Sequence, residues 1–132
     1  MRKNILTGAL AFIAVPVMAW EGNIAVETPQ TQIILHAKEG QDLRMAYYGA
    51  KVASLSQLQE AGDDLDFPAM PAFGTVDMVQ LPALQVQHAN GDLNLELQVT
   101  DYSWADDGAA IVHTFTLQDK LQPVTVNLFY KA

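Results

Sequence analysis

Apolar and polar residues alternate with a period of two along most of the chain after residue 22. Successive side chains of a strand point to opposite faces, so this pattern predicts strands with one apolar face each. The predicted strands cover residues 23–28, 31–37, 42–48, 82–88, 93–100, 109–117 and 123–130. We therefore expect sheets that each bury one face and leave the other in solvent.

Short turn signals separate these strands. Asn90-Gly91 accepts positive φ at both central turn positions and predicts a hairpin between residues 82–88 and 93–100. Residues 106–108 read Asp-Asp-Gly, which predicts another turn. Residues 54–61 break the alternation with leucines three apart, a serine followed three residues later by glutamine, and a glycine just beyond. This combination is typical of a short capped helix.

Short strands joined by tight turns predict an all-β fold, an antiparallel β-sandwich with one short helix. Residues 63–77 form the longest segment without clear periodicity and contain two prolines and four acids. Long ordered loops are frequent sites of binding, so this segment is a candidate functional loop.

The N-terminus reads as an export signal. Arg2 and Lys3 precede the apolar stretch 5–17, and Val17-Met18-Ala19 offers the small residues that signal peptidase reads. The apolar stretch is shorter than the roughly 20 residues that span a bilayer, although a membrane anchor or a buried helix is the alternative. We expect a signal peptide over residues 1–19, a β-sandwich over residues 20–132, and no membrane insertion after signal cleavage.

Composition narrows the class of protein. The 132 residues carry a formal charge of −8, and loss of Arg2 and Lys3 with the signal lowers it to −10. Nucleic-acid binding requires clustered Lys and Arg, so it is excluded. The absence of cysteine excludes a disulfide scaffold and a thiolate metal site. An exported chain without cysteine suits the periplasm or cell surface of a bacterium.

The titratable residues indicate no catalytic or metal chemistry. The histidines at positions 36, 88 and 113 have no ligand spacing and are expected to be hydrogen-bonded residues of the sandwich. The acids of residues 63–66 lack the spaced pattern of a calcium loop, and nothing nominates a pair of glycosidase carboxylates. We predict no metal, no cofactor and no catalytic residue in this chain.

Four aromatic residues border the predicted loops, namely Tyr48, Phe67, Phe73 and Trp104. An aromatic ring can stack on the apolar face of a sugar, which makes these residues candidates for carbohydrate binding. The alternative is that they belong to the core or to cross-strand pairs.

The order of the small motifs is itself informative. These motifs are Tyr47-Tyr48-Gly49, the short helix, the acidic loop, Pro71-Ala72-Phe73-Gly74, Asp77, Pro82-Ala83-Leu84 and His88-Ala89-Asn90-Gly91. Together they resemble the start of the N-terminal domain of glycoside hydrolase family 36 α-galactosidases, of bacterial and exported type. The resemblance extends over roughly residues 23–130.

The resemblance implies an architecture larger than this chain. In that family a β-supersandwich precedes a (β/α)₈ barrel, in which two aspartates perform retaining hydrolysis of terminal α-galactosyl residues, and a C-terminal β-domain follows. The chain contains no barrel sequence and looks like part of the supersandwich. It is thus expected to be a non-catalytic segment that shapes the oligomer, commonly a homotetramer, and the substrate entrance for α-galactoside oligosaccharides.

The resemblance also implies the sugar-facing residues. By position, residues 63–77 look like the loop that reaches a neighbouring subunit's active site, which nominates Asp64, Asp66, Phe67, Phe73 and Asp77. The family reads Gly-x-Gly-Asp-Phe-Arg where this chain has Gly-Thr-Val-Asp-Met-Val at residues 74–79. The missing arginine leaves Asp77 without an obvious ion-pair partner.

Two alternatives remain open at this point. One is a free-standing carbohydrate-binding sandwich that uses its exposed aromatic residues. The other is a structural envelope protein without a ligand, which the alternating apolar faces fit equally well.

Overall fold

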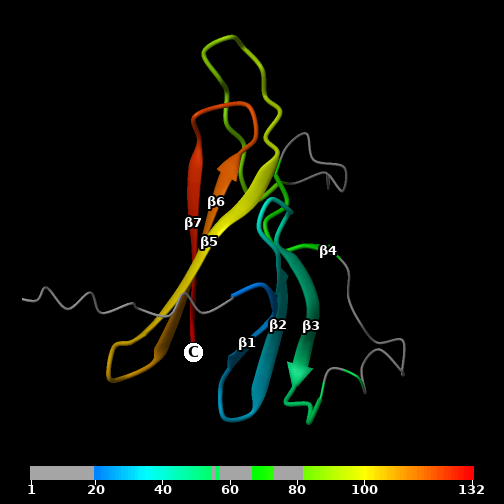
Figure 1. Ribbon diagram of the computed structural model, residues 1–132, viewed down its shortest axis with the longest axis vertical. Coiled ribbons are helices and arrows are strands. Elements are labelled where there is room, and N and C mark those ends of the chain that lie inside the picture. The colour runs from blue at the N-terminus through cyan, green and yellow to red at the C-terminus, as the bar shows by residue number, and fades with distance from the viewer. Residues whose placement is uncertain (1–19, 55, 57–66, 73–81) are drawn as a thin grey trace, which may run out of the picture.

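The chain folds into two antiparallel sheets that pack face to face. The computed structural model describes residues 20–54, 56, 67–72 and 82–132. Within this part, one sheet has the order β1-β2-β3-β4 and the other the order β5-β6-β7 (Figure 1). The strands are β1 Gly22–Glu27, β2 Thr31–Ala37, β3 Arg44–Ala50, β4 Phe67–Pro68, β5 Leu97–Asp106, β6 Ile111–Asp119 and β7 Thr125–Lys131. The predicted all-β antiparallel sandwich is confirmed.

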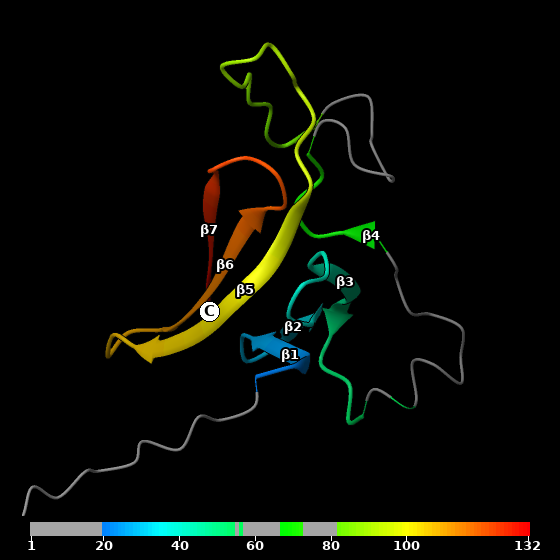
Figure 2. The ribbon, with the colours of Figure 1, turned by 45° about the horizontal axis from the view of Figure 1, so that its top comes forward.

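The core lies between the two sheets, which Figure 2 shows as separate layers. Leu35 of β2 packs in one cluster with Val99, Phe115 and Leu117 of the second sheet, and each is at most 1% exposed. The apolar faces predicted for residues 93–100 and 109–117 are therefore the buried ones. The layers are also joined through the backbone, since the N–H of Gly40 donates to the Val99 carbonyl at 2.9 Å.

The turn predicted at residues 106–108 closes the β5–β6 hairpin. Gly108 has a φ of +83°, a conformation that suits glycine. The Asp106 carboxylate accepts the N–H of Gly108 at 2.8 Å, and the Asp107 carboxylate accepts the N–H of Ala110 at 2.8 Å. The aspartates thus satisfy the backbone of the turn, and β5 extends beyond its predicted end at residue 100 to Asp106.

The strand predicted over residues 82–88 and its hairpin with residues 93–100 are wrong. Residues 82–96 leave the sheets as an extended loop (Figure 1), and an isolated bridge joins Leu84 to Ala72. Gly91 does form a turn with a φ of +85°. The backbone N–H groups of His88 and Gly91 donate to the carbonyls of Asp92 and His88 at 2.9 Å each. The His88 ring adds a bond from Nε2 to the Asn94 carbonyl at 2.8 Å, so the turn is closed without a strand ladder.

The expectation that each sheet has one solvent-exposed face is wrong at β2. Gln32 and Ile34 alternate with the core-facing Ile33 and Leu35, yet they are only 6% and 2% exposed. The Gln32 amide donates to the Glu27 carboxylate and accepts the N–H of Val52 at 3.3 Å. This central strand is therefore buried on both faces, which its sequence alternation did not indicate.

Two predictions fall mainly outside the described residues. These are the signal peptide over residues 1–19 and the helix over residues 54–61, of which 54 and 56 are described. No helix in the described part of the chain is long and apolar enough to cross a membrane.

Candidate functional site

The described part of the predicted binding loop 63–77, residues 67–72, lies at the edge of the first sheet. Phe67 of β4 pairs with Met45 of β3, and the N–H of Ala69 donates to the Leu43 carbonyl at 2.8 Å. Ala72 is fully buried and bridges to Leu84. Residues 67–72 are thus held on one edge of the sandwich.

One of the five predicted sugar-facing residues can be placed. Phe67 lies on β4 and is 45% exposed. Asp64, Asp66, Phe73 and Asp77 lie outside the described residues. Their predicted role therefore remains a prediction.

Tyr48 and Phe67 share one face of the first sheet. Tyr48 pairs with Ile33, and Phe67 pairs with Met45, and both partners pack against the core. Directly opposed residues of a ladder lie on the same face, so both aromatic rings project on the inner side. Tyr48 is 65% exposed and Phe67 is 45% exposed, so the second sheet leaves both rings accessible.

Trp104 lies on the second sheet, with aromatic neighbours that the sequence did not nominate. It pairs with His113 of β6, which in turn pairs with Tyr130 of β7. The Tyr102 hydroxyl and His113 Nδ1 are 2.8 Å apart, with the two rings stacked. Burial lowers the pKa of His113 and raises the pKa of Tyr130. The alternation of β6 and β7 was visible in the sequence, but the alignment of these three residues depends on strand register.

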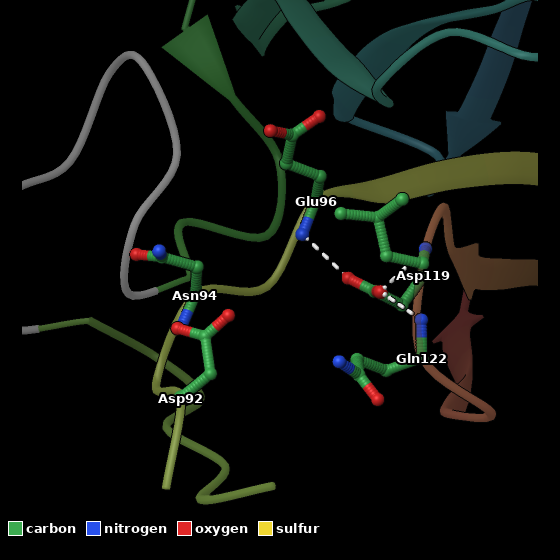
Figure 3. A pocket seen from close by; sticks show the side chains of 6 residues that line it. Asp92, Asn94, Glu96, Asp119 and Gln122 are labelled. Carbon is green, nitrogen blue, oxygen red and sulfur yellow. Dashed lines mark hydrogen bonds between the residues drawn. The ribbon is translucent and has the colours of Figure 1, made fainter. Parts of the chain in front are cut away.

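A shallow hollow of about 90 Å³ lies between residues 92–96 and the β6–β7 turn (Figure 3). Its lining includes three carboxylates, those of Asp92, Glu96 and Asp119. The Asp119 carboxylate accepts the N–H groups of Glu96 at 2.6 Å, Leu121 at 2.9 Å and Gln122 at 2.7 Å. Figure 3 shows the Glu96 carboxylate directed away from Asp119, toward its ion pair with Lys120 at 3.0 Å. These contacts hold the loop and the turn together.

The electrostatics of three carboxylates, Glu27, Asp107 and Asp119, do not favour acid catalysis. Partial burial raises the pKa of Asp119, but its three backbone donors and the nearby His88 outweigh burial and hold the pKa below the usual value. Lys51 lowers the pKa of Glu27, and Lys131 lowers the pKa of Asp107 to about 2. A general acid of a glycosidase needs a raised pKa, so these three carboxyl groups are poor candidates for that role.

The histidines are hydrogen-bonded, as predicted. His36 Nδ1 is 3.0 Å from the Asn23 amide oxygen, while His88 and His113 make the contacts described above. Among residues 20–54, 56, 67–72 and 82–132, no group of three or more His, Asp or Glu side chains is arranged to hold a metal ion.

No family model and no curated protein matches the sequence. The fold does match solved structures. The glycoside hydrolase family 36 α-galactosidase of Geobacillus stearothermophilus, solved in complex with raffinose, has a TM-score of 0.66 and 18% identity, covering 83% of this chain and 20% of that chain. The α-galactosidase of Lactobacillus brevis has a TM-score of 0.61 and 18% identity, covering 83% of this chain and 19% of that chain. The chain thus spans about one fifth of the length of these proteins and has the fold of the part that it matches.

Proposed function

We propose that this chain is the N-terminal, non-catalytic β-sandwich segment of an exported α-galactosidase that hydrolyses terminal α-galactosyl residues of oligosaccharides. The observation that supports the proposal most directly is the fold match to two α-galactosidases. Because the match covers 83% of this chain and at most 20% of either neighbour, it is the relation expected between a segment and a whole enzyme.

The proposal assigns the chemistry to residues beyond this segment. The carboxyl groups with lowered pKa, namely Glu27, Asp107 and Asp119, are occupied by structural contacts. In the proposed enzyme, two aspartates of a catalytic barrel act as nucleophile and acid/base. Its substrates are α-galactosides of the type represented by raffinose.

The segment itself is proposed to shape the substrate entrance and the oligomer, a homotetramer by family resemblance. The loop 63–77 would carry Asp64, Asp66, Phe67, Phe73 and Asp77 toward the sugar of a neighbouring subunit. The anchoring of residues 67–72 of this loop, through β4 and the buried Ala72, supports this role, since a binding loop needs a rigid base. The predicted signal peptide 1–19 places the proposed enzyme in the periplasm or on the cell surface.

The decisive experiment is to measure the mass and activity of the native gene product. An antibody against the sandwich should capture from the source cells a polypeptide several-fold larger than 14.4 kDa. The captured material should release galactose from raffinose. A native product that ends at Ala132 and releases no galactose would refute the proposal.

A pair of variants tests the entrance role. Phe67→Ala removes a partly exposed ring beside the predicted loop, whereas Phe129→Ala removes a ring that is 67% exposed on the outer face of the second sheet. We expect Phe67→Ala to raise KM for raffinose several-fold and Phe129→Ala to leave it unchanged. If both variants have the same KM for raffinose, Phe67 does not lie at the substrate entrance.

A further inference from the structure

A single asparagine of the chain precedes a glycine. The asparagines of the described part are all exposed, namely Asn23, Asn90, Asn94 and Asn127. Gly91 follows Asn90, whereas isoleucine or leucine follows each of the others. Exposure therefore does not distinguish these four side chains, but the residue that supplies the next backbone nitrogen does.

Asn90 and Gly91 lie in the tight turn of the loop 82–96. The His88 carbonyl accepts the N–H of Gly91 at 2.9 Å, and the N–H of His88 donates to the Asp92 carbonyl at 2.9 Å. Gly91 has a φ of +85°, and no atom lies within 4 Å of the position that a Cβ would take there. The space beside Gly91 is thus open.

The amide group of Asn90 is polarised by the turn. The N–H of Asp92 donates to Asn90 Oδ1 at 3.0 Å. A donor at this oxygen stabilises the negative charge that develops when a nucleophile adds to the amide carbon. The side chain of Asn94, in the same loop, is bonded by no described residue. Asn90 therefore combines a polarised amide with an unhindered nitrogen in the next residue.

We propose that Asn90-Gly91 is a site of spontaneous deamidation, a modification independent of the proposed hydrolytic function. The Gly91 nitrogen loses its proton to solvent and attacks Asn90 Cγ, and the new C–N bond closes a cyclic succinimide. Glycine obstructs this attack least because it lacks a Cβ. The Cγ–Nδ2 bond breaks, and the side-chain nitrogen takes a proton from solvent and leaves as ammonia. Water then opens the ring at either carbonyl, which leaves aspartate or isoaspartate, so one water is consumed, one ammonia is released and nothing is oxidised or reduced.

The hydrogen bond of Gly91 makes the rate a measure of how often the turn opens. The His88 carbonyl occupies the N–H of Gly91, so this bond must break before the nitrogen can reach Cγ of Asn90. Opening an exposed loop requires much less free energy than unfolding the whole domain. The folded protein should therefore react, but more slowly than the unfolded chain.

The products alter the turn beside the acidic hollow. Both add a negative charge near Asp92, which lines that hollow together with Glu96 and Asp119. Isoaspartate also lengthens the backbone between residues 90 and 91 by one methylene, so the present pairing across the turn cannot be kept. We expect the loop to loosen where Asp119 accepts the N–H of Glu96.

The test is incubation of the purified native gene product at pH 6 and at pH 9, followed by tandem mass spectrometry of its proteolytic fragments. We expect a gain of about 1 Da at Asn90, the difference between an amide and an acid, with both aspartate and isoaspartate present. The gain should be several-fold faster at pH 9, because the attacking nitrogen must lose its proton. Asn94, which Leu95 follows, is the internal control and should keep its mass.

A variant separates the chemistry from the fold. Gly91→Ala places a methyl group beside the reacting nitrogen, and it should slow the gain at Asn90 several-fold when both proteins are compared in urea, where the turn is absent. Two results would overturn the proposal. The first is an unchanged mass at Asn90 in the folded protein over a period in which the urea-unfolded protein is converted, because the turn then keeps the site closed. The second is an equal gain at Asn90 and Asn94, because the following glycine then has no influence.

Discussion

The Asp119 carboxylate connects residues 92–96 to the β6–β7 turn, and its removal should destabilise the sandwich measurably. Its carboxylate accepts three backbone N–H groups at 2.6 to 2.9 Å. Hydrogen bonds to a charged group contribute about 1.5–3 kcal/mol each when protected, but Asp119 is only partly buried, and water replaces part of that contribution in its absence. By analogy with the loss of a helix cap, Asp119→Ala should lower the free energy of unfolding by about 2 kcal/mol. Asp119→Asn keeps an oxygen for Leu121 and Gln122 and should cost about 1 kcal/mol.

Urea and thermal unfolding at pH 7 provide the assay, with Asp101→Asn as the control. Asp101 is exposed on β5, and no described residue bonds its side chain, so the control removes one charge and no hydrogen bond. Asp119→Ala should melt about 8 °C below the wild type, and Asp101→Asn should unfold within about 0.5 kcal/mol of it. Equal stability of Asp119→Ala and Asp101→Asn would refute the reasoning.

The dependence on pH gives a second check of the same prediction. The pKa of Asp119 lies below its ordinary value of 3.8, so the carboxylate stabilises the fold fully above that pH. The stabilisation disappears as the pH falls through the folded-state pKa. The difference between the wild type and Asp119→Ala should therefore shrink below pH 3.8, and a constant difference down to pH 2 would contradict this explanation.

Three further perturbations test the packing, a surface ion pair and a turn. Phe115→Ala should cost about 3–5 kcal/mol in urea unfolding because Phe115 is fully buried, while the exposed Phe129→Ala should change stability by less than about 0.5 kcal/mol. The Asp107 carboxyl should titrate at about 2 by NMR, and its midpoint should rise in Lys131→Met; an unchanged midpoint would exclude the 2.7 Å pair as the cause. Gly91→Ala should lower stability by about 1–2 kcal/mol in thermal unfolding, since its φ of +85° strains a residue with a Cβ; a neutral effect would mean that the turn rearranges.

Most of the second sheet was readable from local sequence. The alternation in residues 109–117 and 123–130 predicted β6 and β7, and the buried face follows from the apolar positions, of which Phe115 and Leu117 are at most 1% exposed. The Asp-Asp-Gly turn was equally local, because the aspartates bond to N–H groups two or three residues away.

The candidate binding residues could be predicted only in part. Their position beside predicted loops nominated four aromatic residues, namely Tyr48, Phe67, Phe73 and Trp104. Phe73 lies outside the described residues, and the other three are exposed. The contact between Tyr102 and His113 could not be predicted, because it depends on the register of β5 against β6. The failed strand at residues 82–88 has a related cause, since alternation shows a strand-like segment but not whether a partner is available to pair with it.

The sequence by itself determined the all-β class, five of the seven strands in close outline, the Asp-Asp-Gly turn and the apolar face of β6 around Phe115 and Leu117. These features depend on residues within a few positions of one another and on the two-residue period of a strand. Only the tertiary structure decided that Ile34 is buried on the far face of β2, that Asp119 reaches Glu96, and that Trp104 aligns with His113 and Tyr130. Those relations join residues that are distant in sequence, and they follow from strand register and from the extent to which one sheet covers the other.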